Sequence, residues 1–304
     1  MIKRTLYFGS PAYLALKQRQ LEIRQTPDEG GATSVRTIPI EDIGVVLLDH
    51  PQITITHRLL DALLSYNCAV VTCSMNHLPS GLLLPLDGHS LQNKRFRAQL
   101  EASVPLRKRL WQQTIQAKIQ NQAIVLQNVL GEPAKNMIAW SRQVKSGDSE
   151  NLEARAAAFY WRNLFVSLPD FVREREETAP NSLLNYGYAL LRAIIARALV
   201  ATGLLPTLGI HHHNKYNAYC LADDIMEPYR PYVDQLVVEI CEEEGFPSVL
   251  SKEIKARLLS ISALDVEIEG QRRPLMLAAS QTAGSLLRCF TGEGRRLAYP
   301  LLSC

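Results

Sequence analysis

Hydrophobic and polar positions follow two different periodicities along this 304-residue chain, and the change comes near residue 87. Before it, short apolar runs rich in β-branched and aromatic residues alternate with turn residues, which is typical of β-strands. The expected strands are Arg4–Phe8, Tyr13–Lys17, Gln20–Arg24, Val35–Ile40, Val45–Leu48 and Ala69–Cys73. One helix is expected at Thr56–Tyr66, and the glycine pair that ends Pro27–Gly31 indicates a hairpin loop.

After residue 90 the apolar positions recur at helical spacing. The expected helices span residues 95–130, 133–145, 149–166, 181–202, 216–244, 251–261 and 275–290. Gly131 and Gly203 stand where helices end, because glycine readily takes the left-handed conformation of a C-terminal cap. Asp265–Gly270 is the one hairpin expected in this half.

The two periodicities predict an α+β protein. We expect a β-rich domain at residues 1–86, a linker at 87–96 and a larger, all-helical domain at 97–304.

Composition narrows the class of protein. With 47% apolar and 21% charged residues, the chain is expected to be globular. No run was expected to be long and apolar enough to cross a bilayer, and Met1–Thr5 leads into a strand instead of a signal-peptide core. The six cysteines lack paired C-x-x-C spacing, so we expect reduced thiols in a cytoplasmic protein, without a disulfide framework or a zinc ribbon.

Positive charge is concentrated in one segment, although the net charge is only +3. Residues 94–145 carry 10 Lys or Arg and 2 Asp or Glu, whereas residues 146–304 carry 16 and 20. Such a run is often just a solvated helix face, but it also suits the neutralisation of nucleic-acid phosphates. The residues are Lys94, Arg95, Arg97, Arg107, Lys108, Arg109, Lys118, Lys135, Arg142 and Lys145.

Three acidic residues follow closely after a cluster of histidines. If the chain is helical from about Tyr216, Asp223 and Asp224 stand four and three residues before Glu227, and the carboxylates share one helix face. A divalent cation removes the repulsion between them, and hard cations prefer oxygen ligands. An ordinary solvated helix face is the competing interpretation.

The histidines His211, His212 and His213 cannot all be ligands, because alternate residues of an extended stretch point to opposite sides. Imidazole widens the choice of metal toward manganese. Consecutive histidines fit a tetrahedral zinc site poorly.

Glu153 lies near the start of another expected helix, where Asp148 or Ser149 can act as the cap. Most of the positions that follow it are alanine, which allows a second helix or a substrate backbone to come close to the carboxylate. An alanine-rich helix with an exposed glutamate is the alternative.

Both segments together resemble the CRISPR-associated integrase of spacer acquisition, the larger of the two universal adaptation proteins, and in particular its type II branch. The resemblance rests on E-A-R-A-A-A-F-Y-W from Glu153, on H-H-N-K-Y-N from His212 and on the stretch around Glu227, L-A-D-D-I-M-E-P-Y-R-P-Y-V-D. The segment N-Y-G-Y-A-L-L from Asn185 also matches. The resemblance extends over essentially the whole chain.

The resemblance implies that Glu153, His212 and Glu227 are the catalytic residues and hold Mg²⁺ or Mn²⁺. His212 is preferred because it lies fifteen residues before Glu227, although His211 and His213 remain alternatives. Asp224 is expected as an auxiliary ligand, and Tyr188 is expected to line the site. Candidate DNA contacts are Arg107, Lys108, Arg109, Arg155, Lys215 and Arg230, of which the last three are equally suited to salt bridges.

The implied reaction joins the 3′-hydroxyl of a short double-stranded DNA fragment to CRISPR repeat DNA by transesterification. The resemblance also implies that the β-rich domain forms a homodimer, that the dimers assemble with the small companion adaptation protein, and that no membrane is involved. Two other functions stay open. The first is a metal-dependent nuclease that cuts branched DNA, and the second is a DNA-binding assembly scaffold whose metal site is structural.

Overall fold

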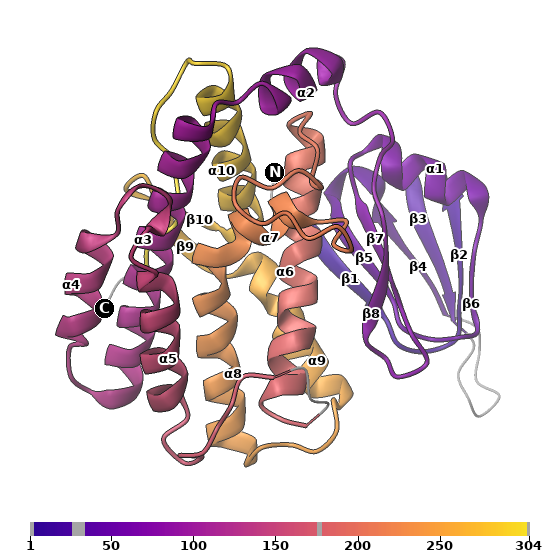
Figure 1. Ribbon diagram of the computed structural model, residues 1–304. Helices are drawn as coiled ribbons and strands as arrows, with labels where there is room; N and C mark the ends of the chain where they lie inside the picture. The colour runs from indigo at the N-terminus through magenta and orange to yellow at the C-terminus, as the bar shows by residue number, and fades with distance from the viewer. Residues whose placement is uncertain (1–2, 26–33, 175–177, 303–304) are drawn as a thin grey trace. The chain divides into compact units, whose positions relative to one another are not determined.

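The computed structural model describes residues 3–25, 34–174 and 178–302, and the chain forms two compact units, residues 1–90 and 91–304 (Figure 1). The first unit is rich in β-strands and the second is mostly helical, as the periodicities predicted. The hairpin loop expected at Pro27–Gly31 lies outside the described residues.

Two four-stranded sheets make up most of the first unit. In one sheet the strand order is β1 (Arg4–Phe8), β5 (Ile43–Leu48), β7 (Ala69–Cys73) and β8 (Pro79–Leu83), and only β8 is antiparallel to its neighbour. In the other the order is β4 (Ser34–Pro39), β3 (Gln20–Gln25), β2 (Ala12–Lys17) and β6 (Ile53–Ile55), with β6 parallel to β2. The 3₁₀ turn η1 (Ile40–Asp42) precedes β5.

The core of this unit takes apolar side chains from both sheets and from α1 (His57–Ser65). Leu14 of β2, Ile43 of β5 and Leu59 of α1 are fully buried. Burial of one such side chain contributes roughly 1.5–3 kcal/mol. All six expected strands are present, whereas β6 and β8 were not expected, because β6 has three residues and β8 contains Pro79 and Gly81.

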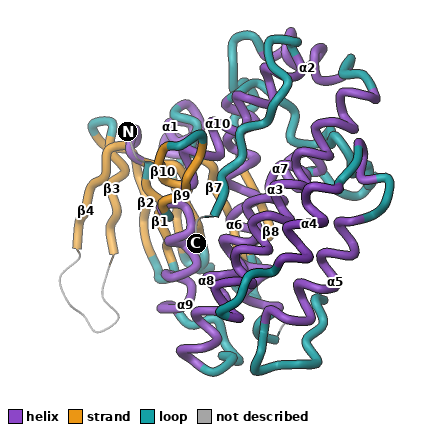
Figure 2. The backbone as a smooth tube through the Cα atoms, turned by 90° about the vertical axis from the view of Figure 1, so that its left-hand side faces the viewer, coloured by secondary structure: helices purple, strands orange, loops and turns teal. Residues whose placement is uncertain are grey.

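Helices fill the second unit (Figure 2). They are α2 (Gln92–Leu100), α3 (Val104–Leu130), α4 (Lys135–Gln143), α5 (Leu152–Leu164), α6 (Asn181–Ala201), α7 (Cys220–Met226), α8 (Arg230–Glu244), α9 (Lys252–Leu259) and α10 (Leu275–Phe290). The 3₁₀ turns are η2 (Ser146–Asp148), η3 (Glu227–Tyr229) and η4 (Ser260–Ala263). Strands β9 (Asp265–Ile268) and β10 (Gln271–Pro274) form the hairpin expected near residue 265.

Two of the expected helices are broken. The helix expected at residues 95–130 is two helices, because the Ser103 hydroxyl accepts from the Leu106 N–H and starts α3, with a proline in its first turn. Helix α2 begins at Gln92, so the last residues of the expected linker are helical. The helix expected at 216–244 begins only at Cys220 and is interrupted by η3, where Pro228 follows Glu227.

The longest helices of this unit pack against several others. Helix α3 contacts α4, α5, α7 and α8, and α6 contacts α7, α8, α9 and α10. Gly131 caps α3 with a φ of 72°, and Gly203 follows α6 with a φ of 70°.

Helix α6 corrects the sequence-based expectation about membrane spans. By length and composition it could cross a membrane, with a mean hydropathy of 1.3 in its most apolar window. In the structure, however, 83% of that window is buried inside the protein. The helix is apolar on nearly all sides because it is packed on nearly all sides.

Candidate functional site

One ammonium group joins two carboxylates that are far apart in the sequence. Lys118 Nζ, from α3, lies 2.7 Å from Glu153 Oε1 of α5 and 2.7 Å from Glu227 Oε2 of η3. The structure therefore brings Glu153 and Glu227, both predicted as site residues, to the same cation. We call Glu153 and Glu227 the carboxylate pair.

The position of Glu153 follows from the way α5 begins. The carboxylate of Asp148 accepts hydrogen bonds from the backbone N–H groups of Leu152, at 3.0 Å, and Glu153, at 2.9 Å. These are the N–H groups that have no partner inside a helix, and a carboxylate also suits the positive end of its dipole. Asp148 is thus confirmed as a capping side chain, and it fixes the backbone of Glu153.

The position of Glu227 is set by its neighbours in η3. The Asn121 side-chain amide donates to the Pro228 carbonyl at 2.7 Å, which ties η3 to α3. Glu227 Oε1 lies 2.9 Å from Arg230 Nε. Its other oxygen, Oε2, is buried and lies 2.7 Å from Lys118 Nζ.

His212 is held by Asp224. Asp224 Oδ1 lies 2.5 Å from His212 Nδ1, and Oδ2 accepts from the His211 N–H at 2.8 Å. Gly209 makes this approach possible, because a Cβ there would lie 2.7 Å from Asp224 Oδ2 and 2.4 Å from the His212 carbonyl oxygen.

The other two histidines differ from His212 in their surroundings. The His211 ring stacks on Trp111, with centroids 4.1 Å apart and planes 1° from parallel, and His212 meets the same indole edge-on at 5.4 Å. His213 is exposed. Of these three histidines, His212 alone has a ring nitrogen bonded to a carboxylate among the residues that the structure describes.

The expected cluster of acids on one helix face is corrected by the structure. Asp223 is bound by Arg192 Nε at 2.6 Å and by the Asn217 amide at 2.6 Å. Asp224 is bound by the histidine loop, and Glu227 by Lys118 and Arg230. The repulsion between these carboxylates is relieved because each of them has its own partners.

Electrostatics in the site favour charged groups despite burial. Burial lowers the pKa of the Lys118 ammonium, but Glu227 and Glu153 outweigh it and raise the pKa above its usual value. Burial alone would raise the pKa of Glu227. The positive charges of Arg230 and Lys118 outweigh burial, and the pKa lies below its usual value.

The two adjacent histidines are shifted in opposite directions. The hydrogen bond to Asp224 raises the pKa of His212, with smaller contributions from Glu227 and Glu153. Burial lowers the pKa of His211, and the neighbouring His212 lowers it further.

The predicted metal ligands do not converge on one point. Within residues 3–25, 34–174 and 178–302, no three His, Cys, Asp or Glu side chains lie close enough to hold a metal ion. Lys118 Nζ instead takes the position between Glu153 and Glu227.

The basic residues predicted to contact DNA fall into two groups. Lys108, Arg109, Arg155 and Lys215 are exposed and Arg107 is half-buried. The Arg155 guanidinium lies over the Trp140 ring at 4.5 Å, and Lys215 Nζ lies over Tyr216 at 4.8 Å. Arg230 is instead the ion-pair partner of Glu227, so it is the salt-bridge alternative that the structure shows.

Tyr188 reaches the site only indirectly. Its hydroxyl donates to Asp234 Oδ1 at 2.5 Å, and Tyr160 donates to Oδ2 at 3.0 Å. The Arg230 guanidinium lies over the Tyr188 ring at 4.7 Å. Tyr188 therefore positions the arginine that pairs with Glu227.

Sequence reasoning missed the role of Lys118, which was counted only as part of the basic segment. A signal was present, because Lys118 stands among the apolar positions of α3, between the buried Ile115 and Ile119. A lysine on the apolar side of a helix requires a buried counter-charge. Trp111 and Asn121 gave no signal, because large apolar and amide side chains are common in helix cores.

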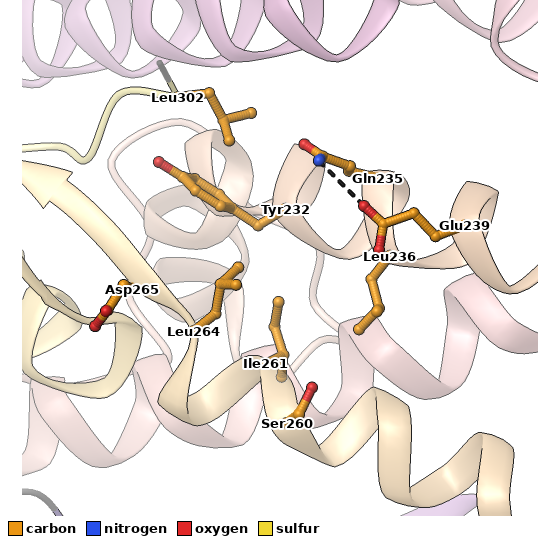
Figure 3. Close-up of a pocket in the computed structure, with 9 residues that line it drawn as sticks. All are labelled: Tyr232, Gln235, Leu236, Glu239, Ser260, Ile261, Leu264, Asp265 and Leu302. Carbon is orange, nitrogen blue, oxygen red and sulfur yellow. Dashed lines mark hydrogen bonds between the residues drawn. The ribbon is translucent and has the colours of Figure 1, made fainter. Parts of the chain in front are cut away.

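A pocket elsewhere in the second unit contains none of the predicted residues. Figure 3 shows it between α8 and the η4 turn, with a volume of about 200 Å³. Gln235 donates to Glu239 at its rim, at 3.2 Å. The other lining residues are Tyr232, Leu236, Ser260, Ile261, Leu264, Asp265 and Leu302.

Comparisons with known proteins agree with the fold and the motifs. The profile of the family "CRISPR associated protein Cas1" matches residues 6–249. The "CRISPR-associated endonuclease Cas1" of Neisseria meningitidis serogroup C (strain 8013) is 36% identical over 286 residues, which cover 94% of this chain and 91% of that protein.

Two solved structures share the fold. A casposase bound to integration product has a TM-score of 0.77 at 19% identity and covers 98% of this chain and 92% of its own. A Cas6-RT-Cas1–Cas2 complex has a TM-score of 0.74 at 19% identity, covering 99% of this chain and 36% of that one. Since the family profile spans most of the sequence and the Neisseria relative aligns nearly end to end, the chain belongs to the Cas1 family of CRISPR-associated proteins.

Proposed function

We propose that this chain is a metal-dependent DNA integrase, which joins the 3′-hydroxyl ends of short DNA fragments to CRISPR repeat DNA by transesterification. The observation that carries the proposal is the carboxylate pair, Glu153 and Glu227. Each carboxylate lies 2.7 Å from the same positive group, the ammonium of Lys118. The reported casposase, a structural relative with the same fold, is described as bound to an integration product.

The donor types of the proposed ligands suit Mg²⁺ or Mn²⁺, and binding of the ion would require their side chains to move closer together. Carboxylate oxygens suit both ions, and an imidazole held by a second carboxylate is a common metal ligand. Glu227 Oε2 and Glu153 Oε1 already face a cation, the Lys118 ammonium, at 2.7 Å each. Glu153, His212 and Glu227 are the proposed ligands, with Asp224 as the residue that orients His212.

The chemistry that a bound divalent cation supplies is neutralisation of phosphate charge and a lower pKa for the attacking hydroxyl. Tyr188, which contacts Arg230, is a poor nucleophile. Burial raises the pKa of Tyr188 well above its usual value, with Asp234 adding to the effect. The attacking oxygen is therefore expected to come from the DNA end or from water.

Exposed basic residues are proposed to hold the DNA backbone. Lys108 and Arg109 lie on the first turns of α3, and neither is part of an ion pair in the part of the chain that is described. Such side chains supply the phosphate contacts that dominate DNA affinity. Arg155 and Lys215 are proposed to add contacts next to Glu153 and His212.

Assembly is proposed on the basis of the relatives. One structural relative is a Cas6-RT-Cas1–Cas2 complex, which supports a small companion protein of the Cas2 kind as partner. The first unit is proposed to form the homodimer, since its strands β4 and β6 are sheet edges and Val35 of β4 is exposed. A cytoplasmic location fits the reduced thiols of Cys220, Cys241 and Cys289.

A strand-joining assay tests the proposal. A labelled fragment with a 3′-hydroxyl end is incubated with repeat DNA, the companion protein and Mn²⁺ or Mg²⁺, alongside the same fragment with a 3′-deoxy end. We expect the hydroxyl fragment to be joined and the deoxy fragment not to be. Joining of the deoxy fragment contradicts attack by the DNA end.

The name of the Neisseria relative, an endonuclease, favours a second candidate function. Hydrolysis uses the same carboxylate pair with water as the nucleophile. In the same assay, equal nicking of the target with either fragment supports the nuclease and argues against the integrase.

A further inference from the structure

Lys118 occupies an unusual place for a lysine. It is 9% exposed, on the α3 face that also buries Ile115 and Ile119. Its ammonium contacts two carboxylates that come from other parts of the chain, at 2.7 Å each. A buried ion pair adds little net stability, because removing charges from water costs nearly as much as their attraction returns. Its position needs another explanation.

The frame that holds the two carboxylates does not depend on Lys118. Glu153 is fixed by the Asp148 cap at the start of α5. Glu227 is fixed by Arg230 and by the hydrogen bond from Asn121 to Pro228. Both glutamate backbones would stay in place if the ammonium moved away.

The contact is also easy to break. Lysine carries its charge on a flexible four-carbon stem, so the ammonium can change position while the α3 backbone stays in place. The side chain of Glu153 is 23% exposed, compared with 7% for Glu227, so a cation from solvent can approach on the Glu153 side.

We infer that Lys118 is a built-in counter-cation, which neutralises Glu153 and Glu227 before metal binds and which a divalent cation displaces from between them. The inference rests on the proposed metal site. It predicts competition, because a divalent cation and an ammonium cannot both lie within 3 Å of the same two oxygens without strong repulsion.

The experiment compares Mn²⁺ binding by the wild-type chain and Lys118→Met, which is one atom shorter, keeps the unbranched apolar stem and removes the charge. Free Mn²⁺ is measured by its electron paramagnetic resonance signal, and the midpoint of thermal unfolding is measured with EDTA and with Mn²⁺. Lys118→Gln, which can still donate to a carboxylate, is the second variant in case Lys118→Met does not fold. Lys145→Met is the matched control, because it removes an exposed lysine that pairs with Glu150.

We expect Lys118→Met and Lys118→Gln to bind Mn²⁺ on the order of tenfold more tightly than the wild type, since a repelling charge is gone. In EDTA their unfolding midpoint should fall, because two buried carboxylates then face each other, and Mn²⁺ should restore it. Lys145→Met should bind Mn²⁺ as the wild type does.

Equal or weaker Mn²⁺ binding by both Lys118 variants overturns the inference, because the ammonium would then be a permanent part of the metal-bound site. That result leaves the proposed function intact, provided that the wild type binds Mn²⁺. Failure of every form of the protein to bind Mn²⁺ removes the metal site itself and with it the proposed function.

Discussion

Asp224 holds His212 by both its ring and its backbone. One carboxylate oxygen, Oδ1, lies 2.5 Å from His212 Nδ1 and 3.3 Å from the His212 backbone nitrogen. Because Nδ1 faces the carboxylate, Nε2 is the ring nitrogen left for a ligand or a substrate. The side chain of Asp224 is completely buried while that of His212 is about half exposed, so the imidazole is presented from a fixed base.

Asp224→Asn should therefore weaken metal binding without removing a proposed ligand. Loss of the charged partner leaves the imidazole less basic and less firmly oriented, and changes of this kind typically reduce metal affinity about 10–100-fold. We expect a similar fall in the rate of strand joining. Mn²⁺ titration and single-turnover joining at several Mn²⁺ concentrations measure the two effects.

His213→Ala is the matched control for that experiment, because His213 is exposed and adjacent in sequence. It should join DNA normally, whereas His212→Ala should not. If His212→Ala is active and either His211→Ala or His213→Ala is inactive, the histidine replaced in the inactive variant is the ligand, and the assignment to His212 is wrong. His211→Ala removes the stacking on Trp111 and should mainly lower stability.

Replacing either glutamate with alanine should abolish joining, but the two changes should differ in stability. Glu227→Ala removes the carboxylate that Arg230 and Lys118 share in a buried site, which costs roughly 3–5 kcal/mol. Glu153→Ala should cost less, because Lys118 keeps Glu227. Urea unfolding of the folded variants measures the free energies.

The DNA affinity of both glutamate variants should stay close to that of the wild type, since the proposed phosphate contacts lie on other residues. Joining activity in both variants would contradict the metal mechanism. Equal stability of the two variants would contradict the larger cost expected for Glu227→Ala.

The fold could be predicted largely from periodicity, and the places where prediction went wrong have local causes. Helix α10 was expected at the residues where it is found, because no proline interrupts its pattern. The helix expected at 216–244 is broken by η3, and a three-residue turn flanked by helix barely alters the apolar periodicity. Strand β6 is too short for alternation to show.

The site was less predictable than the fold. Sequence motifs drew attention to Glu153, His212 and Glu227, but local spacing did not show that Asp223, Asp224 and Glu227 each bind a different partner. The orientation of each carboxylate is set by a partner that is distant in the sequence, such as Arg192 for Asp223. Helical spacing predicts contacts between residues three or four positions apart. Lys118 and Glu227 are 109 positions apart in the sequence, and the packing of α3 on η3 brings them together.

Charge reversal at Arg107, Lys108 and Arg109 should weaken DNA binding and flatten its dependence on salt. Each phosphate contact on duplex DNA contributes about 0.9 to the slope of log affinity against log salt. Affinity measured by fluorescence anisotropy from low to moderate salt gives that slope. Arg272→Glu, at an exposed position of β10, should leave the slope unchanged. An unaltered slope in the triple variant would mean that these residues form an ordinary solvated helix face.

Asp234 lies in the interior next to the site and is bonded by two tyrosines. Burial raises the pKa of its carboxyl to about 7, although the hydrogen bonds from Tyr188 and Tyr160 act in the opposite direction. An aspartate in the unfolded chain releases its proton near pH 4. Between about pH 4 and pH 7 the folded protein therefore binds more protons at this residue than the unfolded chain.

It follows that Asp234 makes the protein less stable as the pH rises through that range, by up to about 4 kcal/mol in the free energy of unfolding. Asp234→Asn keeps a neutral group of the same shape, whose oxygen can still accept from Tyr188, and removes the titration. We expect the variant to gain stability relative to the wild type between pH 5 and pH 8, as measured by urea unfolding at each pH. Asp61→Asn, at an exposed position of α1, is the control and should show no such trend. A constant difference between Asp234→Asn and the wild type would mean that the carboxylate stays ionised in the folded protein, held by Arg230 and Arg173.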